Sequence, residues 1–207
     1  MSLAIETQPS AAPPQPLARR RWTTEEFYRL MDDGYVREGS STYLWDGEII
    51  DPMPEKPPHI AVEEFFVDFL VGVYPKDAWT IRADKPLRLR DGYEPQPDVM
   101  VLRGHRSTFL PRHPTPADVE LLVEIASTTY AFDSGDKLAE YARAAIPGYW
   151  IVHLAERTIW VCSHPDVERG IFRDRTPFRP GAAIPLGDRA VAVADVFQPL
   201  RDDLTDG

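Results

Sequence analysis

The sequence predicts an α/β fold in which a mixed central β-sheet is flanked by α-helices, and three observations support this. The apolar run 121–126 is short and bounded by turn-forming residues, which is typical of a buried strand. A helical pattern over 133–145 separates it from a second apolar run at 149–152. A strand–helix–strand unit of this length favours a parallel pair of strands. Asp46-Gly47 between two short apolar runs predicts an antiparallel hairpin over 43–50.

Two helices are expected in the N-terminal half. Thr23 is followed three residues later by Glu26, a capping-box pattern that predicts a helix ending at Gly34. Apolar positions at helical spacing predict a second helix over 59–73.

The helix after the 121–126 run is expected to begin near Asp133, whose carboxylate can cap a helix N-terminus, and to end at Pro147-Gly148. Further strands are expected at 79–82, 86–90, 98–102, 158–162, 170–173 and 190–193, followed by a short closing helix.

Composition indicates one domain in a reducing compartment. The chain has 207 residues, of which 43% are hydrophobic, so it can bury a substantial core. We expect a single domain over 22–207, preceded by a disordered Pro/Ala-rich segment over 1–21. Cys162 is the single cysteine, which excludes an internal disulfide. With no signal-peptide pattern and no apolar stretch of membrane-spanning length, we expect a cytoplasmic protein without membrane contact.

The charge balance is acidic overall and basic in the middle of the chain. A formal net charge of −10 argues against binding nucleic acid through overall charge. Residues 82–113, however, hold seven basic and four acidic residues. This local excess of positive charge fits a substrate-facing patch and an ordinary solvated surface equally well.

Glu124 is the most informative residue, because it interrupts the apolar run 121–126. A carboxylate in a buried strand is costly unless it is paired, hydrogen-bonded or bound to a metal. Alternation places Leu122, Glu124 and Ala126 on one face of the strand. Pairing with a buried arginine such as Arg88 or Arg143 is the structural alternative to a functional role.

Asp98 and Lys137 are candidates to join Glu124. Asp98 follows a proline at the start of the strand expected at 98–102, and Lys137 lies early in the following helix. If the two strands are neighbours, two carboxylates meet at one place, which suits Mg²⁺ or Mn²⁺. A nearby lysine would offset their repulsion and could orient a water molecule. Asp98 as a turn residue and Lys137 as a surface charge are the alternatives.

Several motifs resemble those of the Uma-type endonucleases, a family of the PD-(D/E)XK nuclease superfamily with the restriction-endonuclease-like fold. The resemblance covers roughly residues 22–200 in the expected order. The motifs are Asp46-Gly47-Glu48, Pro57-Pro58-His59, Gln96-Pro97-Asp98, Val123-Glu124-Ile125-Ala126, Asp133 to Lys137, Tyr141-Ala142 and Ile146-Pro147-Gly148-Tyr149-Trp150-Ile151-Val152.

The resemblance implies a role for each matching residue. Asp98 matches the aspartate of the PD motif and Glu124 the second acidic ligand. Ala126 stands where the superfamily has a lysine, and Lys137 matches a lysine moved onto the following helix. Glu48 matches an upstream acidic residue, and His59 a histidine that either serves the site or packs at the start of a helix. Ser127-Thr128-Thr129 departs from the serine/proline-rich loop of much of the family.

The leading hypothesis is a Mg²⁺- or Mn²⁺-dependent endonuclease that hydrolyses DNA phosphodiester bonds. Asp98, Glu124 and the backbone carbonyl of Ile125 would hold the cation, and Lys137 would position the attacking water. Arg88 and Arg90 alternate with leucines, so both could grip the DNA backbone.

A homodimer is expected by analogy, because duplex cleavage needs two active sites. Two other hypotheses about the function remain. The first is a catalytically silent nucleic-acid- or protein-binding module on the same fold. The second is hydrolysis of a smaller phosphoester or nucleotide. No Gly-rich phosphate loop, Gly-x-Ser-x-Gly motif or zinc-type histidine pair points to other chemistry.

Overall fold

A six-stranded mixed sheet forms the centre of the computed structural model, which describes residues 20–37 and 39–200. The neighbouring pair β5–β6 is parallel and every other neighbouring pair in the sheet is antiparallel, so the predicted parallel pair in a mixed sheet is confirmed. In spatial order the strands are β3 (Trp79–Ala83), β4 (Val99–Arg103), β5 (Val119–Ala126), β6 (Gly148–His153), β7 (Thr158–Asp166) and β8 (Ile171–Phe178).

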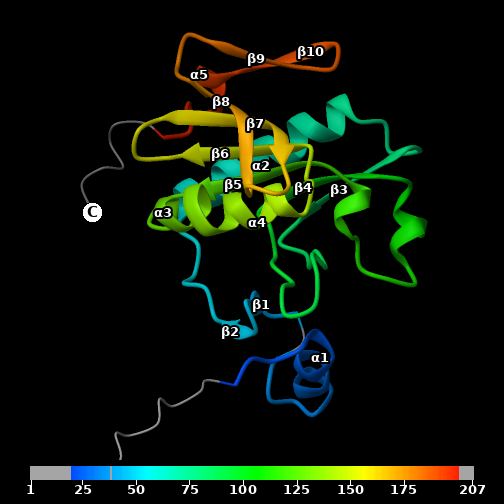
Figure 1. Ribbon diagram of the computed structural model, residues 1–207. Coiled ribbons are helices and arrows are strands. Elements are labelled where there is room, and N and C mark those ends of the chain that lie inside the picture. Colours follow the sequence, from blue (N-terminus) through cyan, green and yellow to red (C-terminus); the bar gives the residue numbers. More distant parts are fainter. Residues whose placement is uncertain (1–19, 38, 201–207) are drawn as a thin grey trace, which may run out of the picture.

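Helices cover both faces of this sheet (Figure 1). Helix α2 (Pro57–Val73) lies on one face, where β9 (Ala183–Leu186), β10 (Arg189–Ala192) and α5 (Val193–Val196) complete the layer. The opposite face carries a continuous helical stretch, which consists of α3 (Tyr130–Phe132), the π-helical segment η3 (Asp133–Lys137) and α4 (Leu138–Arg143).

Strand β5 supplies both halves of the core, as its alternation predicts. Leu121, Val123 and Ile125 pack in the cluster beneath α2. Leu122 and Ala126 pack in the cluster beneath α4. Because Glu124 shares the parity of Leu122 and Ala126, its side chain points toward α4.

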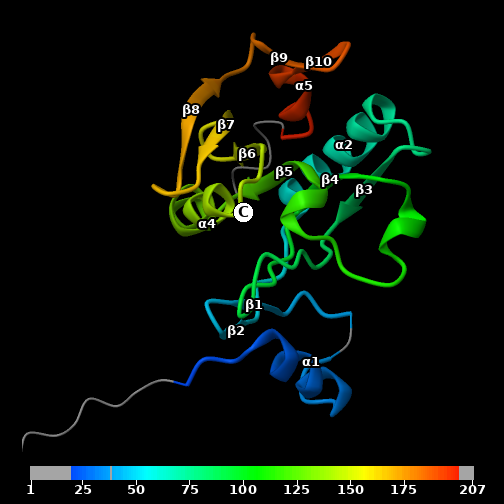
Figure 2. The same ribbon diagram turned by 45° about the vertical axis from the view of Figure 1, so that its right-hand side comes forward.

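The N-terminal elements lie together at one end of the sheet (Figures 1 and 2). They are α1 (Thr24–Asp32) and the antiparallel pair β1 (Tyr43–Trp45) and β2 (Glu48–Ile50). Thr23 and Glu26 form the predicted capping box. Asp46 and Gly47 have φ values of 49° and 68°, which is the left-handed pair that a two-residue hairpin turn requires.

The connection between β4 and β5 contains two short 3₁₀ helices, η1 (Arg106–Phe109) and η2 (Pro116–Asp118). The expected segment 1–21 lies outside the described residues except for Arg20 and Arg21. No helix in the described part of the chain is long and apolar enough to span a bilayer.

The prediction of a strand at 86–90 is wrong, because the described residues between β3 and β4 form no strand. This segment hydrogen-bonds irregularly across the Asp91-Gly92 turn, with Leu87 N–H donating to the carbonyl of Pro95 at 2.9 Å. A regular ladder cannot form here because the facing segment contains Pro95 and Pro97, which have no N–H group to donate. Strand β9, in contrast, has no counterpart among the strands expected from the sequence.

The expected role of Asp133 as a helix N-cap is also wrong. The helical stretch begins three residues earlier, at Tyr130, and the N–H of Asp133 donates to the carbonyl of Thr129 at 3.0 Å. Asp133 lies inside the helix and is buried. Tertiary packing against the sheet, rather than the local capping preference, decides where this helix starts.

Candidate active site

Glu124 is only 1% exposed, and both of its carboxylate oxygens are hydrogen-bonded. The Tyr141 hydroxyl donates to Oε1 at 2.7 Å, and Lys137 Nζ donates to Oε2 at 2.8 Å. The buried-arginine alternative is excluded, because Arg88 binds Glu94 and Arg143 binds Glu140 instead. Two residues of the helical stretch therefore hold the strand glutamate.

Lys137 is a buried cation rather than a solvated surface charge. It is 9% exposed, and its Nζ lies 3.1 Å from Oδ1 of Asp133 as well as close to Glu124. Burial opposes the charge of Lys137, but the neighbouring carboxylates of Glu124, Asp133 and Asp98 outweigh it and raise the pKa of its ammonium group. Lys137 therefore stays protonated between two acidic partners.

Burial raises the pKa of the Glu124 carboxyl group, which Lys137 opposes and the negative charges of Asp98 and Asp133 reinforce. The carboxylate form is thus strained electrostatically by its acidic neighbours and held mainly by Lys137. A further positive charge placed near Glu124 and Asp98 would relieve this repulsion.

Asp98 lies immediately before β4 and reaches across to the neighbouring strand. Its Oδ2 accepts a hydrogen bond from the backbone N–H of Ile125, the residue after Glu124. His59 Nε2 of α2 lies 3.5 Å from the same oxygen. Asp98 therefore stands between the α2 N-terminus and Glu124, at the end of the sheet where the predicted residues were expected to meet.

Further acidic groups lie near Asp98: Glu55 just before α2, Glu63 within α2, and Asp84 just after β3. Ligand atoms of Glu55, His59 and Asp98 all lie within 4.8 Å of one another, and so do carboxylate oxygens of Glu55, Glu63 and Asp84. Sequence reasoning missed Glu55, Glu63 and Asp84. His59 and Glu63 are four residues apart in α2 and so share a helix face, which was the signal that could have found Glu63; Glu55 precedes the helix.

The pKa values of this acidic group shift upward together. Burial raises the pKa of Glu63 to about 7 and that of Asp84 to about 6, and the neighbouring carboxylates add to both shifts. Burial opposes the charge of His59, but Asp98, Glu55 and Glu63 prevail and raise its pKa to about 9. His59 is therefore a cation at neutral pH among mutually repelling carboxylates.

These residues fit a hard divalent cation. Carboxylate oxygens dominate the donor set, and Mg²⁺ and Mn²⁺ prefer such ligands. His59 Nε2 lies 3.5 Å from Oδ2 of Asp98 and 3.7 Å from Oε1 of Glu55, and it could bind a cation only after losing its proton. Asp98 belongs to the group with Glu55 and His59, and it also lies near Glu124. It could therefore bind a cation together with either set of residues.

The other residues predicted for the site lie outside this acidic group. Glu48 is exposed on β2 and forms an ion pair with Arg21 at 2.9 Å. Arg88 donates to the buried Glu94 at 3.1 Å, and Arg90 pairs with Glu140 at 2.9 Å. Each arginine thus has a carboxylate partner in this state, and its contact with a nucleic acid stays a prediction.

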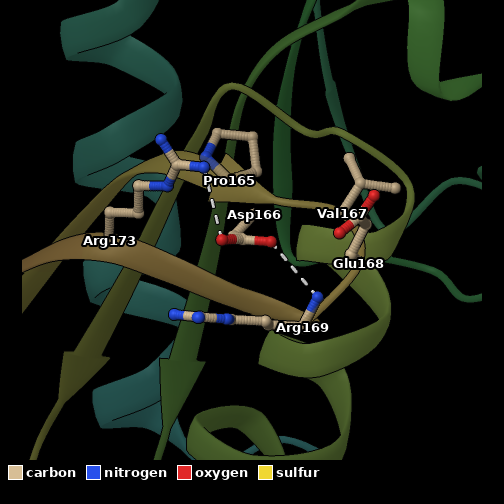
Figure 3. Close-up of a pocket in the computed structure, with 6 residues that line it drawn as sticks. All are labelled: Pro165, Asp166, Val167, Glu168, Arg169 and Arg173. Atoms are coloured by element: carbon tan, nitrogen blue, oxygen red, sulfur yellow. Dashed lines mark hydrogen bonds and ion pairs between the residues drawn. The ribbon is translucent and has the colours of Figure 1, made fainter.

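An open hollow of about 540 Å³ lies on the turn between β7 and β8 (Figure 3). In its wall, Asp166 binds Arg173 at 3.3 Å and accepts a hydrogen bond from the backbone N–H of Arg169. This turn lies beyond Ser163, which pairs with Gly148 at the start of β6, whereas the candidate site lies at the opposite, carboxyl end of β5 and β6. We therefore do not assign the site to this hollow.

The fold and the site together define the class. Asp98, just before β4, and Glu124 of β5 lie at one end of the mixed sheet, and Lys137 of the following helical stretch donates a hydrogen bond to Glu124. A family model described as "Putative restriction endonuclease" matches residues 24–189. The chain therefore belongs to this family, Uma2, which supports nuclease function in general.

A solved structure shows the same fold. It is the crystal structure of "a putative nuclease belonging to DUF820 from Anabaena variabilis ATCC 29413", with 18% sequence identity and a TM-score of 0.65. The similarity covers 85% of this chain and 97% of that chain. No curated protein matches the sequence.

Proposed function

We propose that this protein is an endonuclease that uses Mg²⁺ or Mn²⁺ to hydrolyse phosphodiester bonds of DNA. Family membership supports nuclease function in general. The observation that carries the proposal is the buried Glu124, hydrogen-bonded to Lys137 at 2.8 Å beside Asp98. A buried carboxylate next to a second one, with a single lysine between acidic partners, suits a site that takes up a divalent cation.

Asp98, Glu124 and the backbone carbonyl of Ile125 would hold the cation. When bound, a divalent cation polarises a phosphoryl oxygen and lowers the pKa of a bound water molecule. Lys137, which is kept protonated by its neighbours, would orient the attacking water and offset the negative charge that develops on the phosphate.

Three further roles complete the proposal. His59 is charged at neutral pH and next to Asp98, so it could donate a hydrogen bond to a phosphate oxygen. Arg88 and Arg90 would contact the DNA backbone after exchanging their carboxylate partners for phosphate. Glu48 would tune a second cation after leaving its ion pair with Arg21.

Plasmid nicking tests the proposal. We expect the wild-type protein to relax supercoiled DNA with Mg²⁺ or Mn²⁺ and to lose this activity with EDTA. Asp98→Ala and Glu124→Gln should abolish nicking, whereas Glu168→Gln on the exposed β7–β8 turn should retain it. Equal nicking by wild type and Asp98→Ala would remove the nuclease assignment from this site.

A catalytically silent binding module is the second candidate. It is favoured by the net charge of −10 and by the hydrogen bonds that Lys137 and Tyr141 donate to the two carboxylate oxygens of Glu124. Calorimetry separates the two candidates, because a silent module should show no uptake of divalent cations that depends on Asp98 and Glu124. Activity on model phosphodiesters without salt-sensitive DNA affinity would instead indicate a smaller substrate.

We also propose that the protein acts as a homodimer in the cytoplasm. Cleavage of both strands of a duplex requires two active sites, which a twofold dimer supplies. The free and buried Cys162 is consistent with a reducing compartment. Sedimentation equilibrium should give twice the monomer mass of 23.5 kDa, and a monomer at micromolar concentration would contradict the dimer.

A further inference from the structure

The π-helical segment η3 places two side chains of opposite charge inside the molecule. Asp133 is 2% exposed and Lys137 is 9% exposed, while Asp136 between them faces solvent. The Tyr149 hydroxyl of β6 donates to the backbone carbonyl of Asp133 at 2.9 Å, which ties this segment to the central sheet. π-Helical turns recur at functional sites, where an inserted residue redirects side chains.

Lys137 serves two carboxylates at once. Its Nζ lies 2.8 Å from Oε2 of Glu124 and 3.1 Å from Oδ1 of Asp133. Glu124 has a second partner in Tyr141, whereas Oδ1 of Asp133 accepts no hydrogen bond from the residues that the structure describes. A buried carboxylate that neither caps the helix nor pairs elsewhere among these residues depends on Lys137 for its charge balance.

In the proposed function, Glu124 coordinates a divalent cation, and this weakens its interaction with Lys137. A carboxylate oxygen that coordinates a cation loses much of its attraction for an ammonium group, and the cation itself repels that group. Lys137 then needs another anchor if it is to stay beside the attacking water. Asp133 is the carboxylate already in place on the other side of the ammonium group.

We propose that Asp133 is a positioning residue that holds the Lys137 ammonium group at the site when Glu124 binds a divalent cation. This inference rests on the proposed function, and Asp133 itself touches neither substrate nor cation. Asp133 thus keeps Lys137 in place whether or not Glu124 binds a cation.

The lysines of this chain make a direct test possible. They are Lys56, Lys76, Lys85 and Lys137, and only Lys137 is buried. Its Nζ lies 5.6 Å from the ring centroid of Phe132, so ring currents and burial should separate its ¹³Cε–¹Hε signal from those of the exposed lysines. Lys137→Arg, which lacks this signal, assigns it.

Glu124→Gln removes the glutamate charge without any metal and so imitates its withdrawal. We expect the Lys137 signal to stay shifted in Glu124→Gln, because Asp133 still holds the ammonium group. It should move to the position of the exposed lysines in the double variant Glu124→Gln/Asp133→Asn. Glu124→Gln/Asp136→Asn is the matched control in the same segment and should keep the shifted signal. Release of Lys137 by Glu124→Gln alone, or retention in the Asp133 double variant, overturns the proposal.

Kinetics and metal binding give the functional test. Asp133→Asn should lower kcat by about tenfold or more with KM unchanged, and the affinity for Mn²⁺ measured by calorimetry should stay within about threefold of wild type. An unchanged kcat in a folded Asp133→Asn variant of an active enzyme overturns the proposal. If wild type neither cleaves DNA nor binds Mn²⁺, the proposed function fails, while the metal-free spectra still decide whether Asp133 holds Lys137.

Discussion

Glu124 depends on its hydrogen-bond donors more than on its position in the strand. Its two oxygens are bound by Lys137 and Tyr141, which lie one turn apart on the same helical stretch. Loss of one donor leaves a buried carboxylate oxygen without a partner, and such a loss costs more than an average hydrogen bond contributes. The acidic neighbours of Glu124 increase this dependence.

Tyr141→Phe should therefore destabilise the protein. The Tyr141 ring stays in the core, but Oε1 of Glu124 loses the hydroxyl that donates to it at 2.7 Å. We expect a loss of about 1–3 kcal/mol in the free energy of unfolding, measured with urea. Tyr35→Phe is the matched control, because Tyr35 is 80% exposed. Equal stability of the two variants would show that the hydroxyl contributes nothing.

Glu63 should make stability depend on pH. Burial and the charge of Asp84 raise its pKa from 4.5 to about 7 in the folded state. A folded pKa above the unfolded value means that the stabilising contribution is present below pH 4.5 and is lost as the pH rises through about 7. Without divalent cations, the free energy of unfolding of wild type minus that of Glu63→Gln should fall across this range. The exposed neighbour in Glu64→Gln should show no such fall.

The helical stretch 130–143 shows how an element can serve the site at some cost to its own regularity. Its π-helical segment contains Gly135, which has low helix propensity. The structure leaves open space there, since a Cβ added to Gly135 would meet nothing within 4 Å. The glycine is therefore not required by packing.

Gly135→Ala should stabilise the protein by about 0.5–1 kcal/mol, because alanine loses less backbone freedom on folding. Thermal unfolding followed by circular dichroism measures this change. Gly34→Ala is the contrasting control: Gly34 has equal space but a φ of +78°, so alanine should destabilise there. Destabilisation by Gly135→Ala would indicate that η3 needs glycine for its π-helical geometry.

At the scale of the whole molecule, the acidic group around Asp98 joins parts that are distant in sequence. Asp98 precedes β4, His59 lies in α2, and Glu124 lies in β5. A cation bound among them would link the N-terminal end of one helix to two strands of the central sheet. Its binding free energy would then add to the stability of the entire fold.

Mg²⁺ should stabilise the folded protein in proportion to its occupancy. At a concentration 100 times Kd, we expect about 2.7 kcal/mol of additional stability. Urea unfolding with and without Mg²⁺ measures it. Asp98→Asn should lose most of the gain, whereas Asp174→Asn, an exposed change on β8, should keep it. The same gain in both variants would place the cation elsewhere.

Several elements could be predicted because their signals are local. The capping box of Thr23 and Glu26, the Asp46-Gly47 turn and the apolar alternation of 121–126 each act within a few residues, and the structure confirms all three. The strand expected at 86–90 failed because its outcome depended on prolines in the facing segment. Asp133 was misplaced because its burial depends on the sheet beneath it.

The sequence by itself determined the class of fold, the parallel strand pair and the residues Asp98, Glu124 and Lys137 as candidates. Periodicity and side-chain chemistry are properties of the chain, so they can be read before it folds. Only the tertiary structure decided which side chains contact Glu124 and Asp98. It showed that Glu124 binds Lys137 and Tyr141, that Glu55 and His59 lie close to Asp98, and that Glu63 and Asp84 lie close to the same Glu55. Distances and burial between remote segments arise when α2 and the helical stretch dock on the sheet, and no local pattern encodes them.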